Sequence, residues 1–272
     1  MKISVIVPTY KPQSYLWTCL DSLSGQTFPK DDYEVILVLN GCREPYYSQI
    51  QEYVANTRLN INFIHSDTGG VSNARNIGLD IASGEYVTFI DDDDYVSPLY
   101  LQELYDKSDE KTIVLAYPYA FNDGNDEQQI SYAITDTYDA MSSNGRMPFS
   151  SEVRKYFNGP WMKLIPMNFI QGRRFDPRFK NGEDALFMFS ISDRFQFVDY
   201  TSTKAIYYRR YRENSAVTSK KTSCYIFKNT LHLSVAYSSI FFRHPLDYKL
   251  GFFINRLMAT FRSMIYTLKH DE

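Results

Sequence analysis

The amino-acid sequence predicts an α/β fold, in which strands alternate with helices and build an open, mostly parallel sheet. With 272 residues, of which 44% are apolar, the chain is large enough to bury a sizeable core. Short continuous apolar runs, rich in β-branched residues, are typical of strands that are buried on both faces. The segments between these runs repeat apolar residues at helical spacing, and this alternation favours a parallel sheet with right-handed crossovers.

The strands are predicted from the apolar runs, and the helices from the segments that separate them. The apolar runs lie at residues 3–7, 35–39, 61–64, 86–90 and 113–116. Helical spacing occurs at residues 16–23, 46–54, 74–81 and 101–105. Ser97 and Pro98 precede the last of these segments, and a capping serine followed by proline is typical of a helix start.

The second half of the chain is less regular. Residues 122–151 are polar and begin with a turn signal, Asn-Asp-Gly-Asn-Asp-Glu, so we expect a variable insert without a regular element after the turn. Apolar structure resumes around residues 161–170. A helix is predicted over 185–191, and two short strands are predicted at 195–198 and 205–208.

The C-terminal segment, residues 220–272, is predicted to be a basic, amphipathic helical extension. It carries a net charge of +5, whereas residues 1–219 carry −8. An apolar stripe at helical spacing runs from Leu250 to Leu268. The basic residues off this stripe are Arg256, Arg262 and Lys269. Such a helix either lies on a membrane surface or packs on the main domain or across a homodimer, and we favour packing.

Composition and charge exclude several classes of protein. The net charge of −3 gives no field that would gather nucleic acid, so no nucleic-acid partner is expected. Three cysteines without C-x-x-C spacing do not make a structural zinc site. The apolar run at 3–7 is too short for a signal-peptide core, and no apolar segment reaches the roughly 20 residues of a spanning helix. We therefore expect a cytoplasmic protein. Any contact with the membrane is expected to be peripheral, at its inner face.

The strongest candidate for chemistry is a run of four acids, Asp91, Asp92, Asp93 and Asp94, directly after the strand predicted at 86–90. Ligands bind at the carboxyl ends of the strands in open parallel sheets, so this placement favours a functional site over a solvated surface run. If the extended geometry continues, Asp91 and Asp93 point the same way and share a divalent cation, Mg²⁺ or Mn²⁺. Neither a calcium EF-hand nor a P-loop fits, because the glycines that these motifs require are missing.

Four motifs occur in a specific order along the chain. They are VIVPTY at 5–10, GVSNARNIG at 70–78, FIDDDD at 89–94 and GED at 182–184. With this order the chain resembles family 2 glycosyltransferases of the GT-A fold. The resemblance covers about residues 1–215 and leaves the C-terminal segment uncovered.

The resemblance implies a GT-A glycosyltransferase domain at residues 1–219, with a nucleotide-binding half at 1–117 and an acceptor and catalytic half at 118–219. Such an enzyme transfers a sugar, with inversion, from a nucleotide diphosphate sugar, here expected to be a UDP-sugar. The expected acceptor is a glycan or a lipid-linked saccharide in surface polysaccharide biosynthesis. The implied cofactor is Mn²⁺ or Mg²⁺, which carries the charge that develops on the departing diphosphate.

The resemblance also assigns nucleotide and metal contacts. The residues expected at the nucleotide are Pro8, Thr9, Tyr10, Asn40, Arg75, Asp91 and Asp92. Asp91 and Asp93 match the Asp-x-Asp metal motif. Arg75 is expected near the ribose and diphosphate, and the alternative is an ion pair with a surface acid. The family often ends its second strand in two acids, whereas this chain has Leu39 and Asn40, so Asn40 is expected to replace a base contact that leucine cannot make.

In the second half of the chain, Asp184 matches the family's general base, and Glu183 is expected to assist in orientation. Alternatively, Asp184 stabilises the start of the following helix, and both roles are compatible. The residues expected near the donor or acceptor sugar are Trp161, Lys163 and Asp94. Arg209, Arg210 and Arg212 either resemble the family's basic loop near the diphosphate, with Arg209 and Arg212 as its contacts, or form a solvated run.

Two other functions compete with glycosyl transfer. A nucleotidyltransferase also uses paired carboxylates and magnesium, but it normally carries a glycine-rich loop after the first strand, and residues 9–12 contain no glycine. A catalytically silent, sugar-binding relative of the enzyme is suggested by the unusual Leu39. It is disfavoured because the metal acids and Asp184 are all present.

Overall fold

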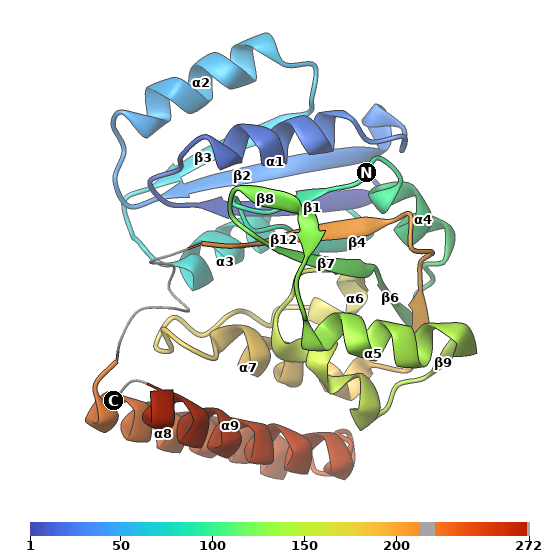
Figure 1. The fold of residues 1–272 in the computed structure, drawn as a ribbon, viewed down its shortest axis with the longest axis vertical. Helices are drawn as coiled ribbons and strands as arrows, with labels where there is room; N and C mark the ends of the chain where they lie inside the picture. The colour runs from blue at the N-terminus through green and yellow to red at the C-terminus, as the bar shows by residue number, and fades with distance from the viewer. Residues whose placement is uncertain (213–220, 271–272) are drawn as a thin grey trace.

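The structure, a computed structural model, describes residues 1–212 and 221–270 and contains the predicted parallel sheet (Figure 1). Strand β1 (Ile3–Thr9) lies between β2 (Tyr33–Asn40) and β4 (Tyr86–Phe89), and β3 (Ile61–Ser66) lies outside β2, with all pairings parallel. Every residue of β1, β2 and β4 is buried, as continuous apolar runs predict. The predicted α/β fold is confirmed.

Helices cover both faces of this part of the sheet. They are α1 (Tyr15–Ser24), α2 (Tyr46–Asn56), α3 (Val71–Ile81) and α4 (Tyr100–Asp106), with a short 3₁₀ turn η1 (Lys30–Asp32) before β2. Helix α3 lies close to β1, because Gly78 has no side chain and a Cβ there would come within 2.6 Å of Ile6 Cγ2. This close packing fixes the position of Arg75, which lies on the same helix.

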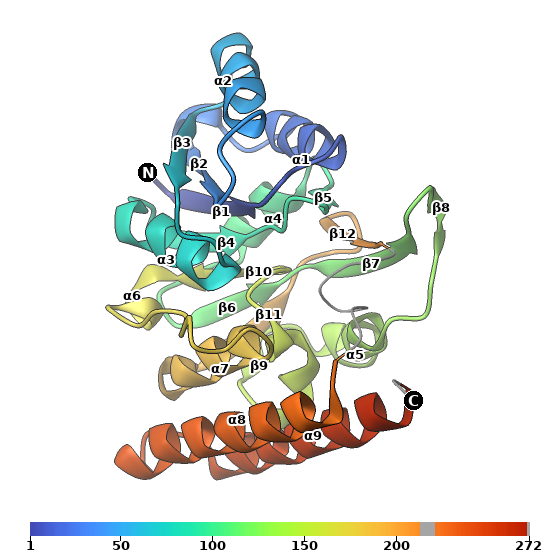
Figure 2. The same cartoon turned by 90° about the vertical axis from the view of Figure 1, so that its left-hand side faces the viewer.

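The second half of the chain extends the sheet and adds a smaller one (Figure 2). Beyond β4 the order is β10 (Lys163–Pro166), β6 (Thr112–Leu115), β11 (Phe197–Tyr200) and β9 (Met147–Pro148). The smaller sheet has the order β5 (Tyr95–Val96), β12 (Ile206–Tyr211), β7 (Tyr117–Asn122) and β8 (Asn125–Gln129). Since β5 directly follows the acid run, its pairing with β12 brings the arginines of β12 to the acids.

The expectation of a polar insert without regular elements at 122–151 is wrong in part. The turn signal closes the β7–β8 hairpin, and helix α5 (Ala133–Met141) follows it. This helix buries Ile134 and Tyr138, which lie one turn apart, and its remaining turns carry polar side chains that mask the helical period. The shorter elements of this half are η2 (Ser142–Asn144), η3 (Ser151–Asn158), α6 (Met167–Ile170), α7 (Glu183–Ser190) and η4 (Ser192–Arg194).

The C-terminal segment forms two antiparallel helices, α8 (Ser223–Arg243) and α9 (Leu250–His270), which make a layer beneath α7 and η3 (Figure 1). The predicted helical extension is thus confirmed, while the boundary predicted at residues 219 and 220 lies outside the described residues. Within the described residues, no helix is long and apolar enough to cross a membrane.

The face that α9 buries differs from the predicted stripe. Phe253 of that stripe packs inward, but Ile254 and Phe261 are exposed, and Arg256, predicted off the stripe, is buried. The reason is that the inward face is completed by Phe252 and Arg256, which pack against η3 and α7. The apolar stripe in the sequence therefore predicted the position of the helix correctly, but it predicted which face is buried only in part.

Candidate active site

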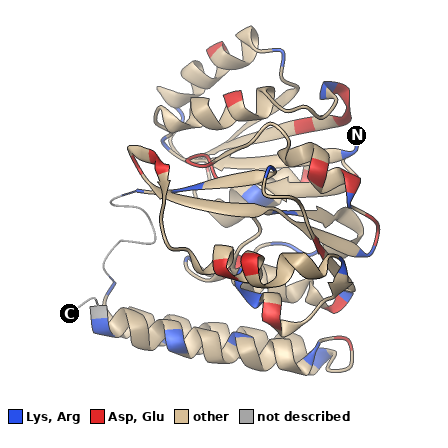
Figure 3. Cartoon of the chain, turned by 45° about the vertical axis from the view of Figure 1, so that its right-hand side comes forward, with Lys and Arg blue, Asp and Glu red and all other residues tan. Residues whose placement is uncertain are grey.

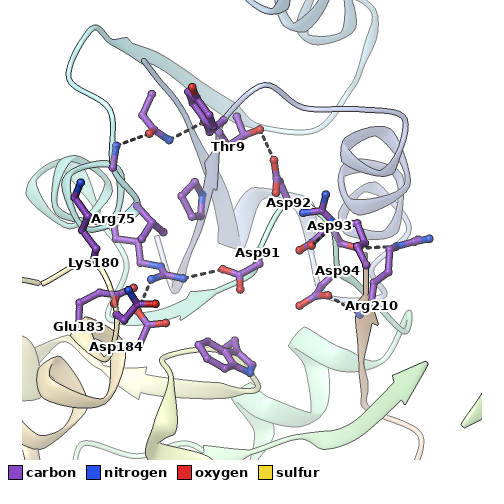
Figure 4. Close-up of a pocket in the computed structure, with 18 of the residues that line it drawn as sticks. Thr9, Arg75, Asp91, Asp92, Asp93, Asp94, Lys180, Glu183, Asp184 and Arg210 are labelled. Carbon is purple, nitrogen blue, oxygen red and sulfur yellow. Dashed lines mark hydrogen bonds and ion pairs between the residues drawn. The ribbon is translucent and has the colours of Figure 1, made fainter. Parts of the chain in front are cut away.

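A pocket of about 990 Å³ lies at the carboxyl ends of β1, β2 and β4, facing the start of α7 (Figure 4). It is the location expected for a ligand in an open α/β sheet. The predicted site residues that line it are Pro8, Thr9, Tyr10, Asn40, Arg75, Asp91, Asp92, Asp93, Asp94, Trp161, Glu183, Asp184, Arg209 and Arg212. The structure thus brings together residues that are far apart in the sequence.

The acid run is a tight turn, in which the Asp94 backbone N–H donates to the Asp91 carbonyl at 3.0 Å. The extended geometry that would make Asp91 and Asp93 point the same way is therefore absent. The Asp91 carboxylate accepts from Arg75 at 2.8 Å, and the Asp93 carboxylate accepts from Arg212 at 2.7 Å. Each of these acids forms an ion pair with a different arginine.

Asp94 is held by the protein itself. The Tyr207 hydroxyl donates to one carboxylate oxygen at 2.7 Å, and the Arg210 backbone N–H donates to the other at 2.8 Å. Burial raises the pKa of Asp94 well above its usual range, and Asp93 and Asp91 add to this increase. These bonds lock the acid turn onto β12, and the contact of Asp94 with a sugar stays a prediction.

Asp92 points toward the end of β1, where the Thr9 hydroxyl donates to it at 2.5 Å. Burial raises the pKa of Asp92 to about 7, and the charges of Asp93 and Asp91 add to the increase. Burial and Asp91 also raise the pKa of Asp93. The turn therefore holds carboxyl groups whose ionisation is unfavourable until further positive charge arrives.

Arg75 connects the two halves of the site. Its guanidinium is 2% exposed and donates to Asp91 at 2.8 Å and to Asp184 at 2.5 Å. Neither expectation for Arg75 describes this arrangement fully, because its partners are acids of the site rather than a surface acid. The bond from α3 to both carboxylates fixes the acid turn relative to the start of α7.

Asp184 lies in the first turn of α7, immediately after Gly182 and Glu183. Gly182 has a φ of +84°, in the region that favours glycine, and a Cβ there would come within 2.7 Å of Leu233. Burial raises the pKa of Asp184 to about 7, while the charge of Arg75 opposes the increase. A pKa near neutral suits a general base, and the helix start remains compatible with this role.

Asn40 and Tyr10 occupy different places at the end of the pocket where β1 and β2 stop. The Asn40 amide donates to the Thr9 carbonyl at 2.7 Å, and its oxygen accepts from the Gly70 N–H at 2.8 Å. Asn40 thereby ties the ends of β1 and β2 to the start of α3, and both ends of its side chain are engaged. Tyr10 is 53% exposed, so its ring forms an open face at the pocket rim.

The arginines of β12 and Arg212, directly after it, meet aromatic rings and acids, which contradicts a solvated run. Arg209 lies over the Trp161 ring at 4.8 Å and donates to the Tyr132 hydroxyl at 2.9 Å. Arg212 lies over the Tyr15 ring at 4.5 Å and donates to Asp93. Sequence reasoning missed both tyrosines, because nothing in their local sequence indicates contact with residues so distant in the chain.

Lys163 is placed away from the pocket. Its side chain is fully buried, and its ammonium donates to the carbonyls of Gly159 and Trp161 at 2.7 and 2.5 Å. Burial lowers its pKa well below the usual range. The sugar contact expected for Lys163 does not fit this placement, and the lysine instead supports the turn that presents the Trp161 ring.

Comparison with known proteins assigns the family. The model of the family described as glycosyl transferase family 2 matches residues 4–177. The chain belongs to this family. It is 28% identical over 273 residues to the poly(ribitol-phosphate) beta-N-acetylglucosaminyltransferase TarS of Staphylococcus aureus. This alignment covers 99% of this chain and 46% of TarS. It is also 30% identical over 225 residues to the glycosyltransferase GlyA of Streptococcus pneumoniae, covering 79% of this chain and 31% of GlyA.

Solved structures agree with this assignment. The crystal structure of Staphylococcus aureus TarS 1–349 in complex with UDP-GlcNAc superposes with a TM-score of 0.74 at 25% identity, covering 98% of this chain and 73% of that one. The mannosyltransferase PcManGT from Pyrobaculum calidifontis, solved with GDP-Man and Mn²⁺, has a TM-score of 0.63 at 15% identity and shows the fold alone. This chain spans about half the length of TarS itself.

The carboxylate oxygens of this family 2 pocket fit a divalent cation whose remaining ligands come from a substrate. Among the described residues, no three Asp, Glu, His or Cys side chains are grouped as a complete metal site. Asp91 and Asp93 each use one carboxylate oxygen for an arginine, so the other oxygen is left for a cation. Mg²⁺ is usually held by one or two carboxylates together with substrate phosphates, and Mn²⁺ accepts similar oxygen ligands.

The raised pKa of Asp92 predicts a pH-dependent effect of the change Asp92→Asn. A carboxyl whose pKa rises from about 3.9 in the unfolded chain to about 7 in the folded one costs no stability below pH 4. The cost grows as the pH rises through that window, because the folded state must then ionise a buried group. Asp92→Asn should therefore raise the melting temperature more at pH 8 than at pH 4.5, measured by thermal denaturation with a chelator present.

The matched control is Asp31→Asn, at an exposed residue of η1. It should change the melting temperature little at either pH. An equal gain for Asp92→Asn at both values would show that the Asp92 carboxyl is no more costly to ionise in the folded state than in the unfolded chain.

Proposed function

We propose that this chain is a metal-dependent, inverting glycosyltransferase domain that transfers a sugar from a UDP-sugar to a hydroxyl of a glycan or lipid-linked acceptor in surface polymer biosynthesis. The observation that carries the proposal is the Arg75 bridge, which holds Asp91 of the acid turn and Asp184 of α7 in one pocket. The bridge holds the proposed metal ligand Asp91 and the proposed base Asp184 close together at the wall of the pocket, which supports a shared role for them at one bound sugar.

The family and the named relatives support the choice of donor and acceptor. The TarS structure that superposes on this chain was solved with UDP-GlcNAc, and TarS is named for transfer to poly(ribitol-phosphate). In this chain Thr9 and Tyr10 line the end of the pocket where β1 stops, which suits the nucleotide. A UDP-sugar is therefore the proposed donor, and a cell-surface polymer is the proposed acceptor class.

In the proposed mechanism, Asp91 and Asp93 would hold the cation, and a bound Mg²⁺ or Mn²⁺ would supply positive charge for the departing diphosphate. Asp184 accepts the proton of the acceptor hydroxyl as that oxygen attacks the anomeric carbon. Arg75 orients the Asp184 carboxylate and favours its ionised form against the effect of burial. The Trp161 ring provides a flat apolar face at the same pocket.

The competing functions are less well supported. The family match disfavours a nucleotidyltransferase. A catalytically silent sugar-binding module would not need an ionisable acid placed beside an arginine at the centre of the pocket, yet Asp184 occupies that position. The geometry therefore favours an active enzyme.

Replacing the proposed base tests this function directly. Asp184→Asn keeps the shape of the side chain but removes its basicity, so sugar transfer should fall by roughly 10² to 10⁴, the usual contribution of a positioned general base. The measurement is the rate of UDP release from UDP-GlcNAc and other UDP-sugars with a panel of surface-polymer acceptors. Affinity for UDP should stay near that of the wild type, because Asp184 does not hold the nucleotide.

Asp176→Asn is the control, since Asp176 pairs with Arg178 outside the pocket and should leave transfer unchanged. Undiminished transfer by Asp184→Asn would show that another group removes the proton. A rate that falls equally in the control would point to a change of folding instead.

We further propose that the layer of α8 and α9 contacts an anionic membrane surface at its cytoplasmic side. Both helices expose large apolar side chains, namely Phe227, Leu231, Val235, Phe242, Leu250, Ile254, Met258, Phe261 and Ile265. Lys and Arg are spaced along the same layer (Figure 3), and Asp247 is the sole acid among residues 221–270. Apolar side chains together with basic ones suit a surface of anionic lipids better than the polar surface of a second protein.

Vesicle binding tests this contact. The full chain should cosediment with vesicles of anionic phospholipid, and binding should weaken as salt rises, since the attraction is screened over about 10 Å at 0.1 M. The double change Phe227→Ser and Phe242→Ser should weaken binding further at every salt concentration. Binding that is independent of lipid charge would contradict the contact with an anionic membrane. A dimer in solution that the same double change disrupts would contradict it as well and would favour a homodimer.

A further inference from the structure

A second cavity, of about 390 Å³, lies between α8, α9 and the start of α7. We call it the basic cavity, because its charged lining residues are Arg154, Lys221, Arg256 and Arg262. None of the described lining residues is Asp or Glu, and none of these four cations forms an ion pair with another described residue. Cations gathered without carboxylates lose hydration and repel one another, so the cavity favours an anion from outside the chain.

Arg256 lies at the wall of this cavity and is the most deeply buried of the four cations. It is 2% exposed, its Nη1 donates to the Asn158 side-chain oxygen at 2.9 Å, and its Nη2 donates to the Phe157 carbonyl. Its Nε has no hydrogen-bond partner among the described residues. The Asn158 oxygen also accepts from Arg154 at 3.2 Å, so one neutral atom serves two guanidinium groups.

No described carboxylate forms an ion pair with the cations of the basic cavity. The charges are opposed only in part, by Tyr237 at Arg256 and Arg154 and by Glu183 at Lys221. Burial lowers the pKa of Arg256 to about 10, and the charge of Arg154 adds to the decrease. Burial, followed by the charge of Arg262, also lowers the pKa of Arg154. These directions are opposite to those of Arg75, whose pKa is raised by the acids around it. An anion in the cavity would reverse this deficit of negative charge.

The basic cavity is continuous with the active-site pocket. The residues that line both are Asn158, Asn181, Gly182, Lys221, Ser263 and Thr267. Gly182 directly precedes Glu183 and Asp184, so the basic cavity adjoins the proposed base. A molecule that presents a hydroxyl to Asp184 can therefore extend into the basic cavity.

We propose that the basic cavity binds a phosphate group of the acceptor, next to the hydroxyl that receives the sugar. This inference rests on the proposed function. An inverting displacement places the attacking oxygen and the leaving diphosphate on opposite sides of the anomeric carbon. Since the donor diphosphate belongs at the acid turn, the acceptor belongs beyond Asp184, where the basic cavity opens. Guanidinium groups bind phosphate oxygens with paired hydrogen bonds, so the lining chemistry matches a phosphodiester.

The test is the affinity of the full chain for a fluorescently labelled tetramer of ribitol phosphate, measured by fluorescence polarisation with UDP and Mn²⁺ at saturation. The nucleotide fills the donor side, so the tetramer reports on the acceptor side alone. Arg256→Gln and Arg262→Gln should each weaken binding by about tenfold, as expected for the loss of one charged hydrogen-bond donor. Lys155→Gln, which removes the same charge from η3 outside the basic cavity, should leave binding unchanged.

Arg262 is exposed, so its variant keeps the test valid if Arg256→Gln fails to fold. Equal affinity of the wild type and Arg262→Gln for the tetramer, or no binding by the wild type, would overturn the phosphate subsite. UDP binding that is intact in the same samples would leave the proposed function standing, and its absence from the wild type would contradict that function instead. Displacement of the tetramer by inorganic phosphate at equal phosphate concentration would assign the cavity to free anions and overturn its link to the acceptor.

Discussion

The structure depends on one electrostatic constraint, which is that several carboxyl groups share a single pocket. Asp91 to Asp94 stand at the end of β4, and Glu183 and Asp184 face them from the start of α7. Burial raises the pKa of Asp92 and of Asp184 to about 7, and the neighbouring carboxylates add to the increase. The protein offsets this repulsion with arginines, and a divalent cation with a diphosphate completes the balance in the proposed enzyme.

The fold supplies these arginines from elements that are distant in the sequence. Helix α3 brings Arg75 to the centre because Gly78 allows it to pack closely on β1. The pairing of β5 with β12 brings Arg210 and Arg212 to the acid turn from the other side. Two different packing contacts thus converge on one charge cluster. This convergence explains why the smaller sheet matters for the site.

Much of the fold and of the site could be predicted from sequence, for identifiable physical reasons. Buried parallel strands such as β1 are continuous apolar runs, and motif residues such as Thr9 and Asp184 follow strands or precede helices, so local sequence places them at the pocket. The direction of a side chain is a different matter. Asp94 and Lys163 are among the predicted sugar contacts, yet their bonds to Tyr207 and to the Gly159 carbonyl arise from packing that local sequence does not encode.

The predictions of helix α5 and of the inward face of α9 were wrong for a related reason. Both bury a narrow face, and in α9 that face includes Arg256, a residue type that a hydrophobic pattern assigns to solvent. The same buried arginine marks the basic cavity. In α9, the position that periodicity assigned to solvent is therefore a buried cation at the wall of this cavity.

The measurement that tests the account most directly is the calorimetric titration of UDP into the wild-type chain with Mn²⁺ and, separately, with a chelator. If the acid turn needs a cation that it shares with a diphosphate, UDP should bind with Mn²⁺ and lose most of its affinity in the chelator. Asp93→Asn should then weaken binding in the Mn²⁺ series and leave the chelator series almost unchanged. Equal affinity for UDP in both conditions would contradict the account, because the arginines alone would then balance the acids and the diphosphate.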